Sequence, residues 1–273
     1  MDRYDDEKHP RIDEAERRVN ELENTENEKY PKITPSQYKE TITEKPTIII
    51  PKKFDFEPEI VFVKGGTFKM GSNQYDSEKP IHDVTLSDFS IGKYPVTQAQ
   101  WQAVMRNNPS HFKGDDLPVE NVSWDECQVF VTRLYGKIGK IYRLPTEAEC
   151  EFAARGGNES KGYQYSGSNN IDEVAWYGKN SENMTHPIGT KKANELGIHD
   201  MSGNVWEWCS DWYCAYDTAA VANPTGADTG TYRVYRGGSW ADDAVGCRIA
   251  NRNSLSPAHS HRRLGFRLVA SFQ

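Results

Sequence analysis

Cysteine thiols are the side chains of this 273-residue sequence that could bind a soft metal or act as nucleophiles. Five are present, at Cys127, Cys150, Cys209, Cys214 and Cys247. The odd number and scattered spacing indicate neither a disulfide framework nor a zinc site. Only Cys209 and Cys214 are close in sequence, and a second pair that would complete a tetrahedral site is missing.

The second feature is the unusual amino-acid composition of residues 241–272. These 32 residues contain no Gln, Glu, Lys, Met or Trp, although the five types make up 60 of the 273 residues. At uniform composition about seven would be expected there. Arginine supplies the positive charge of this segment, and Asp242 and Asp243 are its acids. Composition alone favours a surface loop rich in Ser, Arg and Ala.

Length and charge exclude several classes of protein. The chain is long enough to bury a full core. Its net charge of −7 argues against nonspecific binding of nucleic acid. No run of 18 apolar residues is present, so no segment is expected to cross a membrane. No signal peptide is recognisable, although an exported protein written without its leader would begin in the same way.

The elements that position these residues begin near Ile60. Residues 1–59 are polar and charged, with several prolines, and predict an extension or linker. Residues 60–273 predict one domain. Apolar patterns indicate strands at 61–63, 67–71 and 84–91, and helices at 97–105, 123–135 and 146–155. Ser123 and Glu126 match a capping box at the start of the second helix, whose apolar residues line one face. Turn-forming residues dominate 158–235, so the fold class is irregular α+β, with few helices and short strands.

Seven motifs follow one another through this domain. They occupy residues 62–71, 94–101, 118–124, 143–149, 200–208, 236–240 and 265–267. Taken in order, they resemble the formylglycine-generating-enzyme, or sulfatase-modifying-factor, family over roughly residues 60–270. The resemblance implies an elaborated C-type lectin fold. The motif residues also have a structural interpretation: five tryptophans predict core positions, and Arg143, Arg236 and Arg267 predict buried partners for Glu147, Glu149 or Glu207. The tryptophans are Trp101, Trp124, Trp206, Trp208 and Trp240.

Catalysis is not expected. The oxidase of this family needs a copper(I)-binding cysteine pair soon after the Gly-Gly-Ser motif, and the resemblance places that pair at Asp242 and Cys247. A carboxylate is a poor copper(I) ligand. We therefore predict no catalytic cofactor and no enzyme activity. The alternatives are a formylglycine-generating-type oxidase or related family enzyme, and a structural domain of this fold.

The family resemblance also implies a structural calcium site. Its ligands would be a side-chain oxygen of Asn204, the main-chain carbonyl of Val205 and the carboxylate of Glu207. The alternative needs no metal and pairs Glu207 with an arginine.

The end of the chain is similar to another branch of this fold, the variable proteins of diversity-generating retroelements, and the treponemal variable proteins in particular. Those systems mutate adenines. Randomising the first two bases of an Asn codon gives fifteen amino acids but never Gln, Glu, Lys, Met or Trp, the five types missing here. Fixed-looking residues alternate with heterogeneous ones across a variable region at about 236–267. The fixed-looking residues are Arg236 to Trp240, Cys247, Arg248, Ala250, Arg252, Pro257 and Gly265 to Arg267.

We therefore predict a non-enzymatic ligand-binding protein that displays a diversified surface on a C-type lectin scaffold. The heterogeneous positions should point outward together, and Ser260 can be assigned to either set. The predicted variable residues are Ala241, Asp242, Asp243, Val245, Gly246, Asn251, Asn253, Ser254, Leu255, Ser256, Ala258, His259, His261, Arg262 and Arg263. The histidines and arginines at 259–263 favour an acidic patch on the ligand.

The expected partner is an unidentified protein or other macromolecule, and not nucleic acid. We expect a monomer. The resemblance favours the bacterial cell surface, with a lipid anchor in the precursor, whereas the chain alone is compatible with the cytoplasm.

Overall fold

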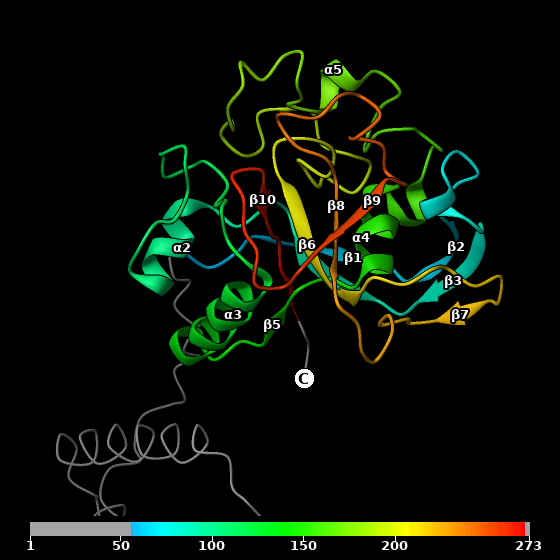
Figure 1. The fold of residues 1–273 in the computed structure, drawn as a ribbon, viewed down its shortest axis with the longest axis horizontal. Helices are drawn as coiled ribbons and strands as arrows, with labels where there is room; N and C mark the ends of the chain where they lie inside the picture. The colour runs from blue at the N-terminus through cyan, green and yellow to red at the C-terminus, as the bar shows by residue number, and fades with distance from the viewer. Residues whose placement is uncertain (1–55, 271–273) are drawn as a thin grey trace, which may run out of the picture. The chain divides into compact units, whose positions relative to one another are not determined.

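The computed structural model describes residues 56–270. The extension predicted at residues 1–59 therefore lies outside the described residues, apart from 56–59. Within the described part, three small sheets and several short helices are joined by long loops (Figure 1). This is the irregular mixture of helices and short strands that the sequence predicts.

Two of the sheets are built mainly from the first part of the domain, residues 60–92. One has the order β1-β4-β11-β5 and the other the order β2-β3-β7. The strands of the first are β1 (Ile60–Val63), β4 (Phe89–Gly92), β11 (Val269–Ala270) and β5 (Tyr142–Arg143). Those of the second are β2 (Gly66–Met70), β3 (His82–Leu86) and β7 (Val221–Ala222).

The single strand predicted at 84–91 is wrong, because β3 ends at Leu86 and β4 begins at Phe89. Ser87 and Asp88 make the break. The Ser87 amide donates to Asn223 Oδ1 at 2.8 Å, and Asp88 Oδ1 accepts from the Gly65 amide at 2.8 Å. These contacts lead the chain out of one sheet and into the next.

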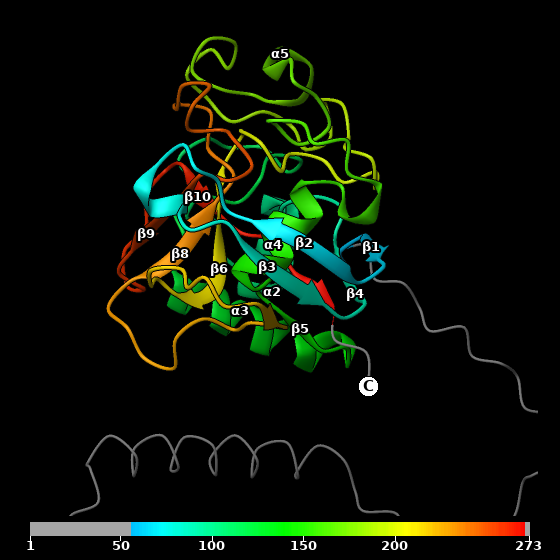
Figure 2. The same ribbon diagram turned by 90° about the vertical axis from the view of Figure 1, so that its right-hand side faces the viewer.

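The remaining sheet contains the strands of the predicted variable region. Its order is β10-β6-β8-β9, so β9 lies at one edge. Figures 1 and 2 both show β6, β8 and β9 side by side. In the antiparallel pair of β8 and β9, Arg236 lies opposite Arg252. The strands are β10 (Leu264–Gly265), β6 (Trp206–Trp212), β8 (Arg233–Arg236) and β9 (Arg252–Leu255).

The three predicted helices are present, and each begins at a capping box. Ser123 accepts from the Glu126 amide while the Glu126 carboxylate accepts from the Ser123 amide, as predicted. Thr97 with Gln100 and Thr146 with Glu149 repeat this arrangement. The helices are α2 (Gln98–Met105), α3 (Trp124–Ile138) and α4 (Glu147–Ala154), with shorter turns at η2 (Asp76–Glu78), η3 (Gly157–Glu159) and α5 (Ile171–Val174).

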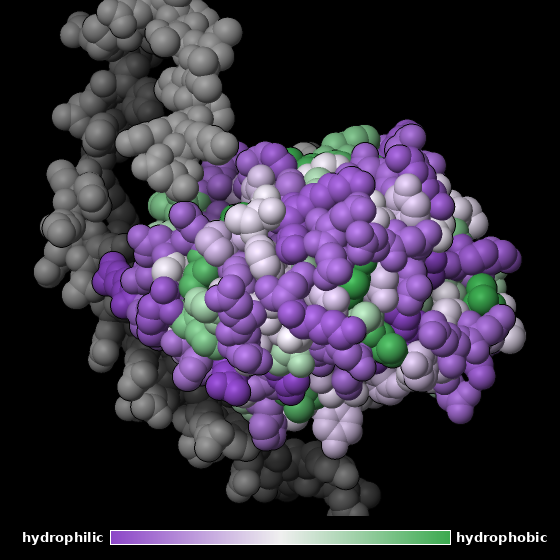
Figure 3. Space-filling view, turned by 90° about the horizontal axis from the view of Figure 1, so that it is seen from above, coloured by the Kyte–Doolittle hydropathy of each residue, from purple (hydrophilic) through white to green (hydrophobic). Residues whose placement is uncertain are grey.

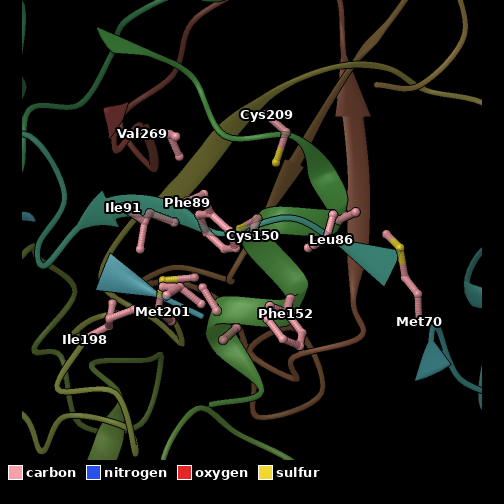
Figure 4. Close-up of a cluster of buried hydrophobic side chains, with 14 of the residues drawn as sticks. Met70, Leu86, Phe89, Ile91, Cys150, Phe152, Ile198, Met201, Cys209 and Val269 are labelled. Carbon is pink, nitrogen blue, oxygen red and sulfur yellow. The ribbon is translucent and has the colours of Figure 1, made fainter. Parts of the chain in front are cut away.

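Helix α4 lies at the centre of one core, since all eight of its residues are buried. Side chains from the first and second sheets pack around it, including Phe89 and Met70 (Figure 4). A second core is built on stacked and edge-on rings of Trp101, Phe130 and Phe266. Four of the predicted core tryptophans are buried, whereas Trp124 is half-buried.

The face over α5 and the adjoining loops is mostly hydrophilic, with scattered apolar side chains (Figure 3). Within residues 56–270, no helix has the length and apolar character required to cross a membrane.

Candidate functional site

The tail, residues 236–267, is fixed to the domain by four arginines that are almost fully buried. We call them the framework arginines: Arg236, Arg248, Arg252 and Arg267. Each guanidinium meets a buried carboxylate from another element. Removing one partner of such a pair leaves an uncompensated buried charge, which typically costs about 3–5 kcal/mol. The backbone of the tail is therefore held by groups other than the predicted variable residues.

Two of these ion pairs lie at the start of the edge strand β9, since Arg252 is its first residue and Arg248 lies four residues before it. Arg248 donates to both carboxylate oxygens of Glu78, with Nη2–Oε1 at 2.5 Å and Nη1–Oε2 at 3.1 Å. Arg252 binds Glu147 in the same two-pronged way, at 2.7 and 2.6 Å. Two parallel hydrogen bonds hold the guanidinium and the carboxylate in one relative orientation, in addition to pairing their charges. Sequence reasoning identified Arg248 and Arg252 as fixed, but it did not find Glu78.

The arginine pairings expected from the motifs are present, although Arg143 is half-buried and only Arg236 and Arg267 are buried as predicted. Arg236 binds Glu147 at 3.2 Å and also Glu151. Arg267 Nε and Nη2 bind Glu207 at 2.5 and 2.7 Å. Arg143 binds Glu149 at 2.6 and 2.7 Å. Several motifs that are far apart in the sequence are thus joined by ion pairs.

None of the fifteen predicted variable residues is buried. Four of the five fixed-looking residues between them behave differently, since Cys247, Arg248, Ala250 and Arg252 are all buried, whereas Pro257 is half-buried. The exposed variable residues are Ala241, Asp243, Val245, Asn253, Ala258, His259 and Arg262. The others are half-buried: Asp242, Gly246, Asn251, Ser254, Leu255, Ser256, His261 and Arg263. Ser260 is also exposed.

The structure brings the two ends of the predicted set together. Asp242 Oδ1 lies 3.8 Å from Arg263 Nη1, and Trp240 Nε1 donates to the Arg262 carbonyl at 3.1 Å. Asn251 contacts the N-terminal end of this set, because its Nδ2 donates to the Gly246 carbonyl at 2.7 Å. Leu255 differs, because it packs against the core that contains Trp101 and Phe130.

Asp242 is tied to framework groups more strongly than its place among the variable residues suggests. Its Oδ2 accepts from Trp206 Nε1 at 2.8 Å and from the Ser239 hydroxyl. Both donors belong to buried residues. Gly246 is coupled to this position, since a Cβ there would lie 2.9 Å from Asp242 Cβ. A side chain at 246 therefore requires an adjustment at 242.

The basic cluster at 259–263 carries less free charge than its composition indicates. Burial, followed by the charge of Arg263, lowers the pKa of His261, so this imidazole is neutral at pH 7. Arg263 faces Asp242. Arg262 is exposed, with its guanidinium carbon 5.3 Å from the centre of the Trp240 ring. The expected attraction for an acidic ligand therefore rests mainly on Arg262.

The donor set at the copper position does not fit copper(I). Cys247 is fully buried, and burial raises the pKa of its thiol. Asp242 uses a carboxylate oxygen to accept from Trp206 and Ser239. Copper(I) prefers a pair of soft thiolates, which this arrangement does not supply. The glycine before Ser239 suits the close packing, because a Cβ on Gly238 would lie 2.6 Å from Cys247 Sγ.

The residues expected to bind calcium are engaged by protein groups. Both carboxylate oxygens of Glu207 accept from Arg267. Asn204 Oδ1 accepts from the His186 amide at 3.1 Å, and its Nδ2 donates to the His186 carbonyl at 3.0 Å. Calcium needs several free oxygen ligands, so this arrangement does not fit the ion. The geometry matches the alternative in which Glu207 pairs with an arginine.

These motifs, with their buried ion pairs and the sheet that they support, define the class of protein. The family model of the sulfatase-modifying factor enzyme 1-like domain matches residues 48–272, and the chain belongs to this family. The fold is the C-type lectin fold of the formylglycine-generating-enzyme type, as predicted.

Particular members of the family can be compared with the chain. The solved structure of Treponema denticola variable protein 1 superposes with a TM-score of 0.73 at 35% identity, over 77% of this chain and 94% of that one. The chaperone protein LppX of Paenibacillus barcinonensis is 37% identical over 78% of this chain and 89% of its own length. The formylglycine-generating enzyme of Streptomyces coelicolor is 29% identical, over 76% and 87%.

Proposed function

We propose that this protein is a non-enzymatic binding protein whose tail displays a diversified ligand-binding surface. The observation that carries the proposal is the division of the tail by burial. The fifteen residues predicted to vary are exposed or half-buried, whereas the framework arginines and Cys247 between them are buried. Side chains at such exposed positions can change without altering the core that holds the backbone.

Two further observations support it. The chain is similar in sequence and structure to a treponemal variable protein. The copper position of the family's oxidase pairs a buried thiol with a carboxylate that already accepts two protein hydrogen bonds. The fold therefore supports display better than oxidation of a thiol.

The decisive experiment is to sequence the DNA on both sides of the gene. The proposal requires a near-identical copy of the segment that encodes the tail, differing from it mainly at adenines, beside a gene for a reverse transcriptase. Absence of this repeat from the whole genome would remove the basis for diversification. Copper-dependent oxygen consumption with a cysteine-containing peptide would instead support the rival oxidase.

The proposal extends to the partner and the location. The ligand is a protein or another macromolecule, bound by a monomer at the bacterial cell surface, with a lipid anchor in the precursor. The resemblance to variable proteins favours this location. Protease treatment of intact cells should remove the protein from the surface, and light scattering of the purified chain should give the monomer mass.

A further inference from the structure

A loop that lies outside the tail is joined to it by buried bonds. This loop, residues 71–81, connects β2 to β3 and contains η2. Its Glu78 is 0% exposed and binds both terminal nitrogens of Arg248. Arg252 Nη1 also donates to the Ser77 carbonyl at 3.3 Å. The loop and the tail therefore form one rigid surface, although Glu78 and Arg248 are 170 positions apart in the sequence.

Tyr75 is connected through Arg248 to one of the predicted variable residues, Val245. The guanidinium carbon of Arg248 is 4.7 Å from the centre of its ring. The same arginine donates from Nε to the Val245 carbonyl at 3.1 Å. Tyr75 is 42% exposed and Val245 is 41% exposed. One buried arginine thus contacts both a constant aromatic residue and an apolar residue of the predicted variable set.

We propose that Tyr75 is a constant aromatic contact of the ligand-binding surface, shared by all copies that differ only in the variable residues. This inference rests on the proposed function. A ring that is held on one side by a guanidinium loses little conformational freedom when a ligand covers the other side. Tyrosine offers a large contact area with a polar tip, which explains its frequent use in binding surfaces built for diverse ligands.

The chemistry around Tyr75 indicates the kind of ligand. Tyr75 and Val245 present apolar surface, and the Tyr75 hydroxyl makes no hydrogen bond to another residue of the described range. A folded protein fits this surface when it packs an apolar side chain over both residues and offers a carbonyl or carboxylate oxygen to the hydroxyl. Val245 and its variable neighbours would then select the ligand, while Tyr75 adds affinity in every complex.

The test uses the full chain and lysozyme as a defined probe protein. A library diversified at the predicted variable positions, with Asp242 retained, is displayed and selected for lysozyme binding. Tyr75→Ala is then introduced into several independent binders, and each dissociation constant is measured by surface plasmon resonance. We expect Tyr75→Ala to weaken binding about ten-fold or more, as is typical of a central aromatic contact. Tyr75→Phe, which keeps the ring, should retain affinity to within about three-fold.

Tyr135→Ala is the matched control, because Tyr135 is an exposed tyrosine on α3. It should leave the dissociation constant unchanged. If Tyr75→Ala has no larger effect than this control across the binders, the inference is overturned while the display function stands. If the library yields no lysozyme binder, the proposed function itself fails and the inference with it. Thermal melting of each variant confirms that the binding measurements were made on folded protein.

Discussion

At the scale of single residues, Asp242 shows that a half-buried position of the predicted variable set can support the fold. Its carboxylate is reached by solvent on one side and accepts from Trp206 and Ser239 on the other. Substitution here affects two buried donors as well as the ligand-facing surface. Residues with an acceptor atom, such as Asp or Asn, should therefore be favoured at 242 among diversified copies.

We expect Asp242→Ala to lower the free energy of unfolding by about 2 kcal/mol, because it leaves buried donors without an acceptor. Asp242→Asn should recover most of this loss, since its amide oxygen can accept the same bonds. Urea denaturation measures both. The control is His259→Ala at an exposed variable position, where a change beyond about 0.5 kcal/mol is not expected. Equal losses at both positions would contradict the anchoring role of Asp242.

The buried carboxyl of Asp211 gives a prediction about pH. Burial, followed by the charge of Glu147, raises its pKa to about 7. The folded state therefore holds a proton that the unfolded state has released, so this group's contribution to stability falls as pH rises toward 7. Asp211→Asn removes this titration. Relative to wild type, its free energy of unfolding should increase by about 2 kcal/mol between roughly pH 5 and pH 7.5.

Asp217 provides the control for that experiment. Bonds from the Ala219 and Thr218 amides lower its pKa, so it is ionised in both states throughout this pH range. The difference between Asp217→Asn and wild type should not change with pH. If Asp211→Asn behaved in the same way, the elevated pKa of Asp211 would be refuted.

At the scale of elements, the η2 loop and the segment that leads into β9 should lose stability together when the ion pair between them, Glu78 with Arg248, is broken. Glu78→Ala leaves Arg248 buried without a counter-charge, and we expect a loss of about 3–5 kcal/mol in the free energy of unfolding. Hydrogen exchange should become faster in residues 245–252 as well as in the loop. Glu59→Gln breaks an exposed pair with Lys93 and should cost less than about 1 kcal/mol.

Several elements were predictable from local sequence because local chemistry determines them. The capping box at Ser123 and Glu126 identified the start of α3, and the spacing of its apolar residues identified the buried face. Strand β6 was not found. Its first four residues, Trp206 to Cys209, are all buried on both faces of the sheet, so no sustained alternation of polar and apolar residues marks it.

The site was partly predictable for a related reason. The five residue types absent from residues 241–272 indicated the exposed and half-buried positions. The residues that resemble fixed positions of variable proteins indicated most of the buried ones. The contacts of Glu78 with Arg248 and of Trp206 with Asp242 depend on tertiary structure, and no local pattern reports them. Tyr75 lacked any signal in the sequence, since its importance follows only from its place beside Arg248.

At the scale of the whole molecule, the ion pair of Glu207 and Arg267 predicts that calcium does not stabilise the domain through Asn204, Val205 and Glu207. The melting temperature should be the same in excess calcium and in a chelator. Glu207→Gln should lower it in both solutions, because Arg267 then loses its counter-charge. The prediction is wrong if calcium raises the melting temperature of the wild type but not that of Glu207→Gln, because that result requires a calcium site at Glu207.

The framework arginines affect how many mutated copies of the gene would still encode a protein that folds. An arginine codon of the form CGN contains no adenine at its first two positions, whereas every lysine codon begins with two. A mutator that acts on adenines would therefore leave the buried cations at 248 and 252 unchanged, provided that both are encoded in this way. Lysine in the same ion pairs would be lost in many offspring genes, and those proteins would fail to fold. If the tail is diversified as proposed, arginine at these positions would keep most of each new generation of sequences able to fold.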